Sequence, residues 1–261
     1  MSGDAIPARG VLLDIAGVLL SGRAALPGAA EAVARLREAG TALRFVTNTT
    51  SRPRRVLLAE LQAAGIGAAP DELFTPAAAA RAWLAREGCR PELLAVPELE
   101  EDFAGLDPAG PPALVVGDAG TDFTYDRLNA ALRLLLEGAP FLALAMNRRF
   151  ADAQGRAVLD AGAFVAALAH GSGREPRLFG KPAPEYFRAA CRDMGVAPGE
   201  AAMIGDDAEA DVAGARAAGI GRALLVETGK YRAGDAAAAG LPDDVLAADI
   251  GAAVARLLGP Q

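Results

Sequence analysis

The chain has 261 residues, of which 52% are apolar and 23% are charged, and its formal net charge is −7. This length and composition are typical of a globular protein with one large core or two modest ones, and we expect two domains. The negative charge argues against extended binding of nucleic acid, because the phosphate backbone would be repelled. The first ten residues lack the apolar core of a secretory signal, and no uncharged run reaches membrane-spanning length. We therefore expect a cytoplasmic protein that binds no membrane.

Apolar runs that favour strands alternate with Ala- and Leu-rich stretches that favour helices near both ends of the chain. Strands are predicted at 11–16, 42–47, 201–205 and 222–227, and helices at 28–39, 53–64, 184–194 and 208–218. Such alternation is typical of βαβ units, which build a parallel sheet covered by helices. The two ends of the chain are therefore predicted to form one α/β domain, residues 1–77 and 177–261.

The middle of the chain has an alternation of its own. Strands are predicted at 92–96, 113–117 and 141–146, and helices at 78–86, 125–137 and 163–169. The turn residues Gly171, Ser172 and Gly173 precede the return to the first pattern. We expect residues 78–176 to form an inserted second domain.

Polar side chains gather where the predicted strands end. Asp14 follows the apolar run 11–13, and the pair Asp206-Asp207 follows a second run. Thr47-Asn48 ends another strand, and Lys181 supplies an ammonium group. Open α/β sheets bind ligands at the carboxyl ends of their strands. Together these residues predict a Mg²⁺-dependent site for phosphoryl transfer.

The carboxylates have distinct predicted roles. Asp14 is the candidate nucleophile, although a strand-end aspartate also serves as a plain loop cap. Mg²⁺ prefers hard oxygen ligands and keeps several waters, so the carboxylates of Asp14 and Asp206 suffice to hold it. Asp207 and Asp211 come next in the chain. There they could hold a metal-bound water, orient Lys181, or favour the positive end of a helix dipole.

The remaining candidates bind the substrate. Thr47 and Asn48 offer hydroxyl, amide and backbone N–H groups to phosphoryl oxygens, and Lys181 offers a compensating charge. Thr47 alone would be a turn residue and Lys181 alone a solvated lysine, but their common position at strand ends favours the site. Arg148 follows a predicted strand of the inserted domain. It is either a contact for a second phosphate or a solvated side chain.

These motifs resemble those of the haloacid dehalogenase (HAD) superfamily of aspartate-nucleophile phosphatases, subclass IIA. The similarity rests on residues 10–19, 115–120, 203–207 and 228–232. It implies an α/β fold with a Rossmann-like doubly wound parallel sheet and an inserted α/β cap domain of the C2 type. It also implies that Asp14 is nucleophile and metal ligand, and that the backbone carbonyl of Ala16 and the carboxylate of Asp206 complete the Mg²⁺ ligands. Members of this group often form homodimers through the cap, so a homodimer is expected.

One position departs from the pattern of the superfamily. Most of its phosphatases have a second aspartate two residues after the nucleophile as general acid, and this chain has Ala16 there. A methyl group transfers no proton, so we expect small substrates with good leaving groups: pyrophosphate, phosphohistidine or phospholysine, and aryl phosphates. The alternative is a pseudophosphatase that binds phosphate or serves as a scaffold. A dehalogenase is a third option, but such enzymes need no metal, and the acidic cluster would then lack a purpose.

Overall fold

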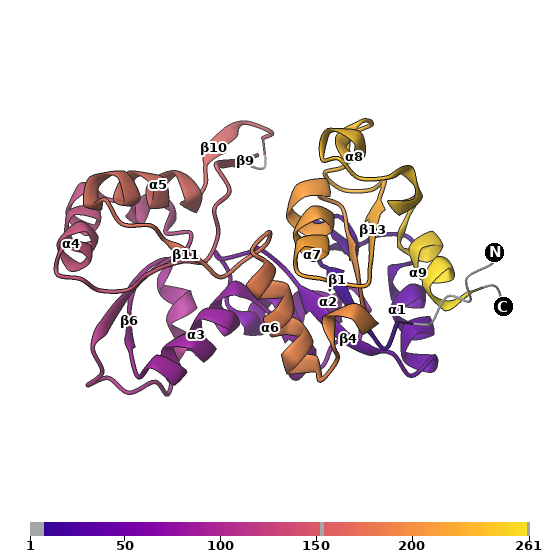
Figure 1. Cartoon of the computed structure of the whole chain (residues 1–261), viewed down its shortest axis with the longest axis horizontal. Helices are drawn as coiled ribbons and strands as arrows, with labels where there is room; N and C mark the ends of the chain where they lie inside the picture. Colours follow the sequence, from indigo (N-terminus) through magenta and orange to yellow (C-terminus); the bar gives the residue numbers. More distant parts are fainter. Residues whose placement is uncertain (1–7, 152–153, 260–261) are drawn as a thin grey trace. The chain divides into compact units, whose positions relative to one another are not determined.

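The strand that carries Asp14, β1 (Gly10–Asp14), lies inside a six-stranded parallel sheet of order β14-β13-β12-β1-β4-β5. The computed structural model describes residues 8–151 and 154–259 (Figure 1). The other strands of this sheet are β4 (Ala42–Val46), β5 (Leu73–Phe74), β12 (Ala201–Gly205), β13 (Arg222–Val226) and β14 (Leu246–Ala247). The chain runs from β1 to β4 on one side, and β12 pairs with β1 on the other. The order of the strands therefore reverses at β1, which is where open sheets form their ligand sites.

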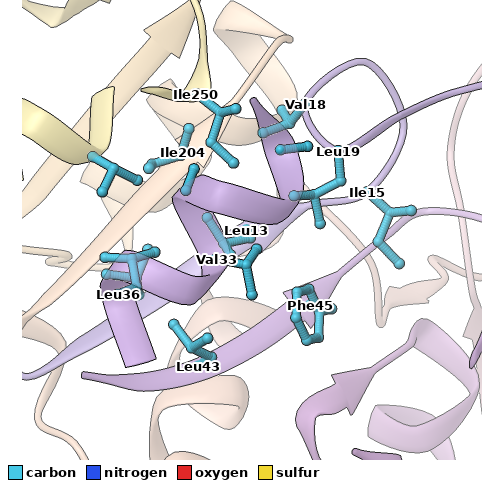
Figure 2. Packing of buried hydrophobic residues seen from close by; sticks show 14 of the residues in the cluster. Leu13, Ile15, Val18, Leu19, Val33, Leu36, Leu43, Phe45, Ile204 and Ile250 are labelled. Atoms are coloured by element: carbon cyan, nitrogen blue, oxygen red, sulfur yellow. The ribbon is translucent and has the colours of Figure 1, made fainter. Parts of the chain in front are cut away.

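Helices cover both faces of this sheet. They are α1 (Ala29–Glu38), α2 (Arg54–Ala63), α6 (Pro184–Met194), α7 (Gly214–Ala217), α8 (Asp235–Ala238) and α9 (Ile250–Leu258), and a π-helical turn, Ala208–Ala213, precedes α7. Buried side chains of α1, α2 and α9 share one apolar cluster with alternate residues of the strands, such as Leu13 and Phe45 (Figure 2). On the other face α6 contacts β1 and β4 and packs against α7. Because both faces are covered, every residue of β1 and β12 is buried.

A short antiparallel hairpin follows β1. Its strands are β2 (Leu20–Ser21) and β3 (Ala24–Ala25). The turn that leads into it is fixed by the backbone, because Gly17 N–H donates to the Leu20 carbonyl at 2.7 Å and Leu20 N–H donates to the Ile15 carbonyl at 2.8 Å. Val18 and Leu19 are buried in the cluster of Figure 2, so the chain directly after Asp14 is held by packing.

Contacts between residues divide the chain into two compact units. The first consists of Met1–Thr47, Arg55–Phe74 and Lys181–Gln261, and the second of Asn48–Arg54 and Thr75–Gly180. The second unit has a four-stranded parallel sheet of order β11-β8-β7-β6 and its own apolar core. Its elements are α3 (Pro76–Glu87), β6 (Arg90–Leu94), β7 (Pro112–Val116), α4 (Tyr125–Leu136), β8 (Phe141–Ala143), β9 (Arg149–Ala151), β10 (Ala157–Leu159), α5 (Ala161–Ser172) and β11 (Arg177–Leu178).

The predicted fold class, an α/β chain with parallel sheets flanked by helices, is confirmed. Most predicted elements have bounds within three residues of the observed ones, and two differ in kind or extent. The strand predicted at 141–146 ends at Ala143, residues 144–148 lie outside helices and strands, and the exposed hairpin β9–β10 begins at Arg149. The helix predicted at 208–218 begins as a π-helical turn. In the described part of the chain the longest helices have 12 residues, and none is long and apolar enough to span a membrane.

Candidate active site

Asp14 ends β1 with its carboxylate buried and fixed from two sides. The residue is 6% exposed. Its Oδ1 accepts the backbone N–H of Ile15 at 2.8 Å and lies 2.8 Å from the Lys181 ammonium. Both contacts use the same oxygen. The orientation of the carboxylate is therefore set by contacts to one of its two oxygens.

Lys181 is a buried ammonium between two carboxylates. Its Nζ lies 2.8 Å from Asp14 Oδ1 and 2.5 Å from Asp211 Oδ1, and the residue is only 3% exposed. Burial alone would lower the pKa of Lys181, but the charges of Asp14 and Asp211 outweigh it and raise the pKa above its ordinary value. Lys181 is therefore a permanent positive charge at neutral pH.

Asp211 is fully buried and uses both of its oxygens. Oδ1 pairs with Lys181, and Oδ2 accepts the backbone N–H of Asp207 at 3.1 Å. Asp207 in turn caps the π-helical turn, since its Oδ1 accepts the N–H groups of Glu209 and Ala210. Of the three roles open to Asp211 in the sequence, the geometry favours orientation of Lys181.

Asp206 follows β12 and is held by a loop that sequence reasoning had left without a role, Thr228 to Lys230. The N–H of Lys230 donates to Asp206 Oδ2 at 2.7 Å, and Thr228 Oγ1 donates to the Gly17 carbonyl at 2.5 Å. A Cβ on Gly229 would lie 2.0 Å from Asp206 Oδ2, and Gly229 has a φ of 63°. Only glycine allows this close approach. The loop follows β13, and that strand-end position was the signal available in the sequence.

The other oxygen of Asp206 is an orphan. Oδ1 is buried and has no hydrogen-bond partner among residues 8–151 and 154–259. A buried carboxylate oxygen without a partner is costly unless a ligand satisfies it. One oxygen each of Asp14, Asp206 and Asp211 lie within 4.8 Å of one another. Hard carboxylate oxygens at this spacing suit a divalent cation.

The carboxylates of this cluster carry more negative charge than Lys181 neutralises. Burial raises the pKa of Asp14, and the charge of Asp206 raises it further, while Lys181 acts in the opposite direction. Burial also raises the pKa of Asp206. A cation bound between Asp14 and Asp206 would relieve both effects. Asp211, whose oxygens are both engaged, is the least suited of the three to serve as its ligand.

Thr47 follows β4, next to the end of β1, and is buried in contact with Tyr186. The Tyr186 hydroxyl lies 2.8 Å from the Phe74 carbonyl and 3.1 Å from the Thr47 carbonyl, and it accepts the Thr47 N–H at 3.4 Å. One hydroxyl thus ties together the ends of β4 and β5. Tyr186 was not among the predicted site residues, because nothing in the sequence distinguishes it from an ordinary core tyrosine of a helix.

The structure brings together some of the predicted residues and not others. Asp14, Asp206, Asp211 and Lys181 form one cluster, and Asp207 is bound to it through its backbone. Ala16 is exposed two residues after Asp14. Asn48 and Arg148 belong to the second unit, and Arg148 is exposed there. The predicted contacts of Ala16, Asn48 and Arg148 with a cation or a substrate stay predictions.

Comparisons with known proteins agree with this geometry. A family model for haloacid dehalogenase-like hydrolases matches residues 11–107, and a second HAD-hydrolase-like model matches residues 178–253. The phospholysine phosphohistidine inorganic pyrophosphate phosphatase of Rattus norvegicus is 41% identical over 233 residues, which cover 87% of this chain and 86% of that protein.

Solved structures give the same result. A p-nitrophenyl phosphatase from Archaeoglobus fulgidus superimposes with a TM-score of 0.87 at 27% identity, covering 96% of this chain and 99% of that one. A glycerol phosphate phosphatase from Mycobacterium tuberculosis in complex with magnesium has a TM-score of 0.81 at 26% identity, covering 97% and 78%. The predicted resemblance and the predicted enzyme class, a HAD-family enzyme with phosphatases as relatives, are confirmed. The chain belongs to the haloacid dehalogenase-like hydrolase family.

Proposed function

We propose that the chain is a Mg²⁺-dependent phosphatase in which Asp14 attacks the phosphorus of a small phosphorylated substrate. One observation carries this proposal. The Asp14 carboxylate, oriented by a buried ammonium 2.8 Å away, has an oxygen within 4.8 Å of one of Asp206, and Asp206 Oδ1 is buried with no partner in the described chain. The proposed nucleophile, a fixed positive charge and the proposed metal ligand thus lie together at the point where the sheet order reverses, which supports the proposal.

The residues present fit a magnesium ion. Asp14 and Asp206 would hold it through carboxylate oxygens, with the backbone carbonyl of Ala16 as a third protein ligand. When bound, such an ion neutralises charge on phosphoryl oxygens. The likeness to a phosphatase in complex with magnesium supports the choice of metal.

The chemistry of the protein residues has two steps. A carboxylate oxygen of Asp14 forms a bond to phosphorus while the bond to the leaving group breaks, and the leaving group departs with its electron pair. Water then attacks the phosphorus of the aspartyl phosphate, which releases phosphate and restores the Asp14 carboxylate. Lys181 and Thr47 would hold phosphoryl oxygens in both steps. The raised pKa of Lys181 makes it an electrostatic partner and not a proton donor.

Ala16 decides which substrates fit this chemistry. A methyl group at this exposed position gives the leaving group no proton, so a substrate whose leaving group is stable as an anion or takes its proton from water reacts fastest. Pyrophosphate, phosphohistidine, phospholysine and aryl phosphates meet that condition. The names of two relatives, a phospholysine phosphohistidine inorganic pyrophosphate phosphatase and a p-nitrophenyl phosphatase, support this substrate class.

We assign the second unit the role of a cap that selects substrates, with residues 78–176 as the inserted domain and residues 1–77 and 177–261 as the core. Asn48 would contribute its amide to the phosphoryl group, and Arg148 would contact a second phosphate or a phosphorylated side chain. The homodimer through the cap and the cytoplasmic location stay predictions from the sequence.

A phosphate-binding protein without turnover is the alternative from another class, and neither the site nor the relatives favour it. Hydrolysis of p-nitrophenyl phosphate separates the two. We expect phosphate release that needs Mg²⁺, is abolished by EDTA, and falls at least about 10³-fold in Asp14→Asn, whose amide cannot attack phosphorus. Glu200→Gln is the matched control, because Glu200 is an exposed carboxylate paired with Arg9.

Wild-type and Asp14→Asn proteins with the same residual rate would refute the nucleophile. Metal-independent turnover of the wild type would refute the role of Mg²⁺. A folded wild type that binds phosphate with Mg²⁺ but turns over no substrate would establish the binding-protein alternative instead.

A further inference from the structure

A pocket with two arginines lies at the amino end of β13, in the same unit as the Asp14 cluster. It is a pocket of about 360 Å³ whose charged lining residues are Arg216, Arg222 and Asp244. Volumes of this size are typical of pockets that hold small molecules. The pocket exists because β14 pairs only with Leu225 and Val226, so in the described chain no strand lies beside the first residues of β13 on that side.

The Arg222 side chain is the unusual member of this lining. Its Nη1 is buried and has no hydrogen-bond partner in the described chain, although arginine offers five donors in a rigid fork. A buried donor without a partner opposes folding, so a packing role alone does not explain it. A guanidinium with one buried nitrogen that has no partner in the described chain is suited to an anion that enters from solution. Arg216, which is exposed on α7, adds a second positive charge.

This pocket is separate from the Asp14 cluster. All strands of the sheet are parallel, and Asp14 and Asp206 follow the carboxyl ends of β1 and β12, whereas Arg222 begins β13. A strand of five residues spans about 13 Å between its first and last Cα atoms, at about 3.3 Å per residue. The two sites thus lie at opposite ends of the parallel strands of one sheet. The proposed chemistry uses no residue of the pocket.

We propose that this pocket binds a small anion with two or more charged oxygens, either a phosphate or a dicarboxylate. The fork of Arg222 takes two of the oxygens, and Arg216 balances the remaining charge. Asp244 bears the opposite sign and limits the affinity for anions. Replacing it by Asn should therefore tighten binding.

The test is an NMR titration of the metal-free, ¹⁵N-labelled full chain with inorganic phosphate in one arm and succinate in the other, at constant ionic strength kept by chloride. Neither turnover nor metal is needed, so the result is independent of the proposed phosphatase. We expect saturable shifts of the amides of residues 216–224 and 244–245. Arg222→Gln should weaken binding about tenfold or more, and Asp244→Asn should strengthen it.

Arg9→Gln is the matched control, because it removes one exposed positive charge that precedes β1 at the same edge of the sheet. Arg216→Gln serves as second variant, since an exposed side chain is dispensable for folding, and it should also weaken binding. The titration whose amide shifts saturate, with phosphate or with succinate, identifies the anion. Equal weakening by Arg9→Gln and Arg222→Gln, equal shifts with chloride alone, or no saturable shift at these amides would overturn the proposal.

Discussion

Replacing Ala16 by aspartate tests the idea that the missing acid sets the substrate class. Ala16 is exposed, so the new carboxyl group should cost the fold no more than about 0.5 kcal/mol. It would stand two residues after Asp14, on the turn fixed by the hydrogen bonds of Gly17 and Leu20. General acid catalysis contributes about 10²- to 10⁴-fold, or about 2.7 to 5.5 kcal/mol of activation free energy.

The gain should depend on the leaving group. An alkyl phosphate must expel an alkoxide and should gain most of that factor in kcat/KM, whereas p-nitrophenyl phosphate and pyrophosphate should gain less than about tenfold. Steady-state kinetics of the wild type, Ala16→Asp and Ala16→Asn on a sugar phosphate, p-nitrophenyl phosphate and pyrophosphate measure the difference. An equal rise on all three substrates would mean that dephosphorylation of Asp14 is slow, and an equal gain in Ala16→Asn would rule out proton transfer.

Three further predictions concern the supports of the site. Gly229→Ala places a methyl group against Asp206 and should raise the Mg²⁺ concentration for half-maximal activity about tenfold, while Gly240→Ala, with a similar φ but open space, tests backbone strain alone. Tyr186→Phe should cost about 1 to 2 kcal/mol in urea unfolding and raise KM, because it frees the ends of β4 and β5; an unchanged KM would limit the residue to stability. Burial raises the pKa of Asp211 to about 7, so the folded metal-free chain holds a proton that the unfolded chain releases. The free energy of unfolding by urea, measured in EDTA, should therefore fall as the pH rises from about 4 through about 7. The same measurement with Mg²⁺ should show a smaller fall.

Much of the first unit could be predicted because its signals are local. The strand predicted at 201–205 and the helix predicted at 184–194 have the same bounds as β12 and α6. The last third of that unit was harder. The two-residue strand β14 has too few residues to show a period, and the π-helical turn at Ala208–Ala213 has the composition of an α-helix. Such short elements are defined by their neighbours in space.

The site residues that lie at the ends of predicted strands could be predicted from the sequence. Asp14, Asp206 and Lys181 each end or follow an apolar run, and the sheet brings two such ends together. The supports escaped prediction because their partners are far apart in the chain. Tyr186 bonds to Thr47 across 139 positions, and Lys230 bonds to Asp206 across 24. Neither pairing has a periodic or compositional signal.

The charges of the cluster explain why its residues are arranged as they are. Asp14, Asp206 and Asp211 are all at most 6% exposed, and Lys181 is the buried positive charge that pairs with two of them. A buried carboxylate without a partner is costly, which is why burial raises the pKa of each. Asp211 is committed to Lys181, and Lys181 is therefore held beside Asp14 even before a cation arrives. Asp206 Oδ1 has no partner in the described chain, and the proposed cation between Asp206 and Asp14 would satisfy it. The phosphoryl group would then bind beside that cation.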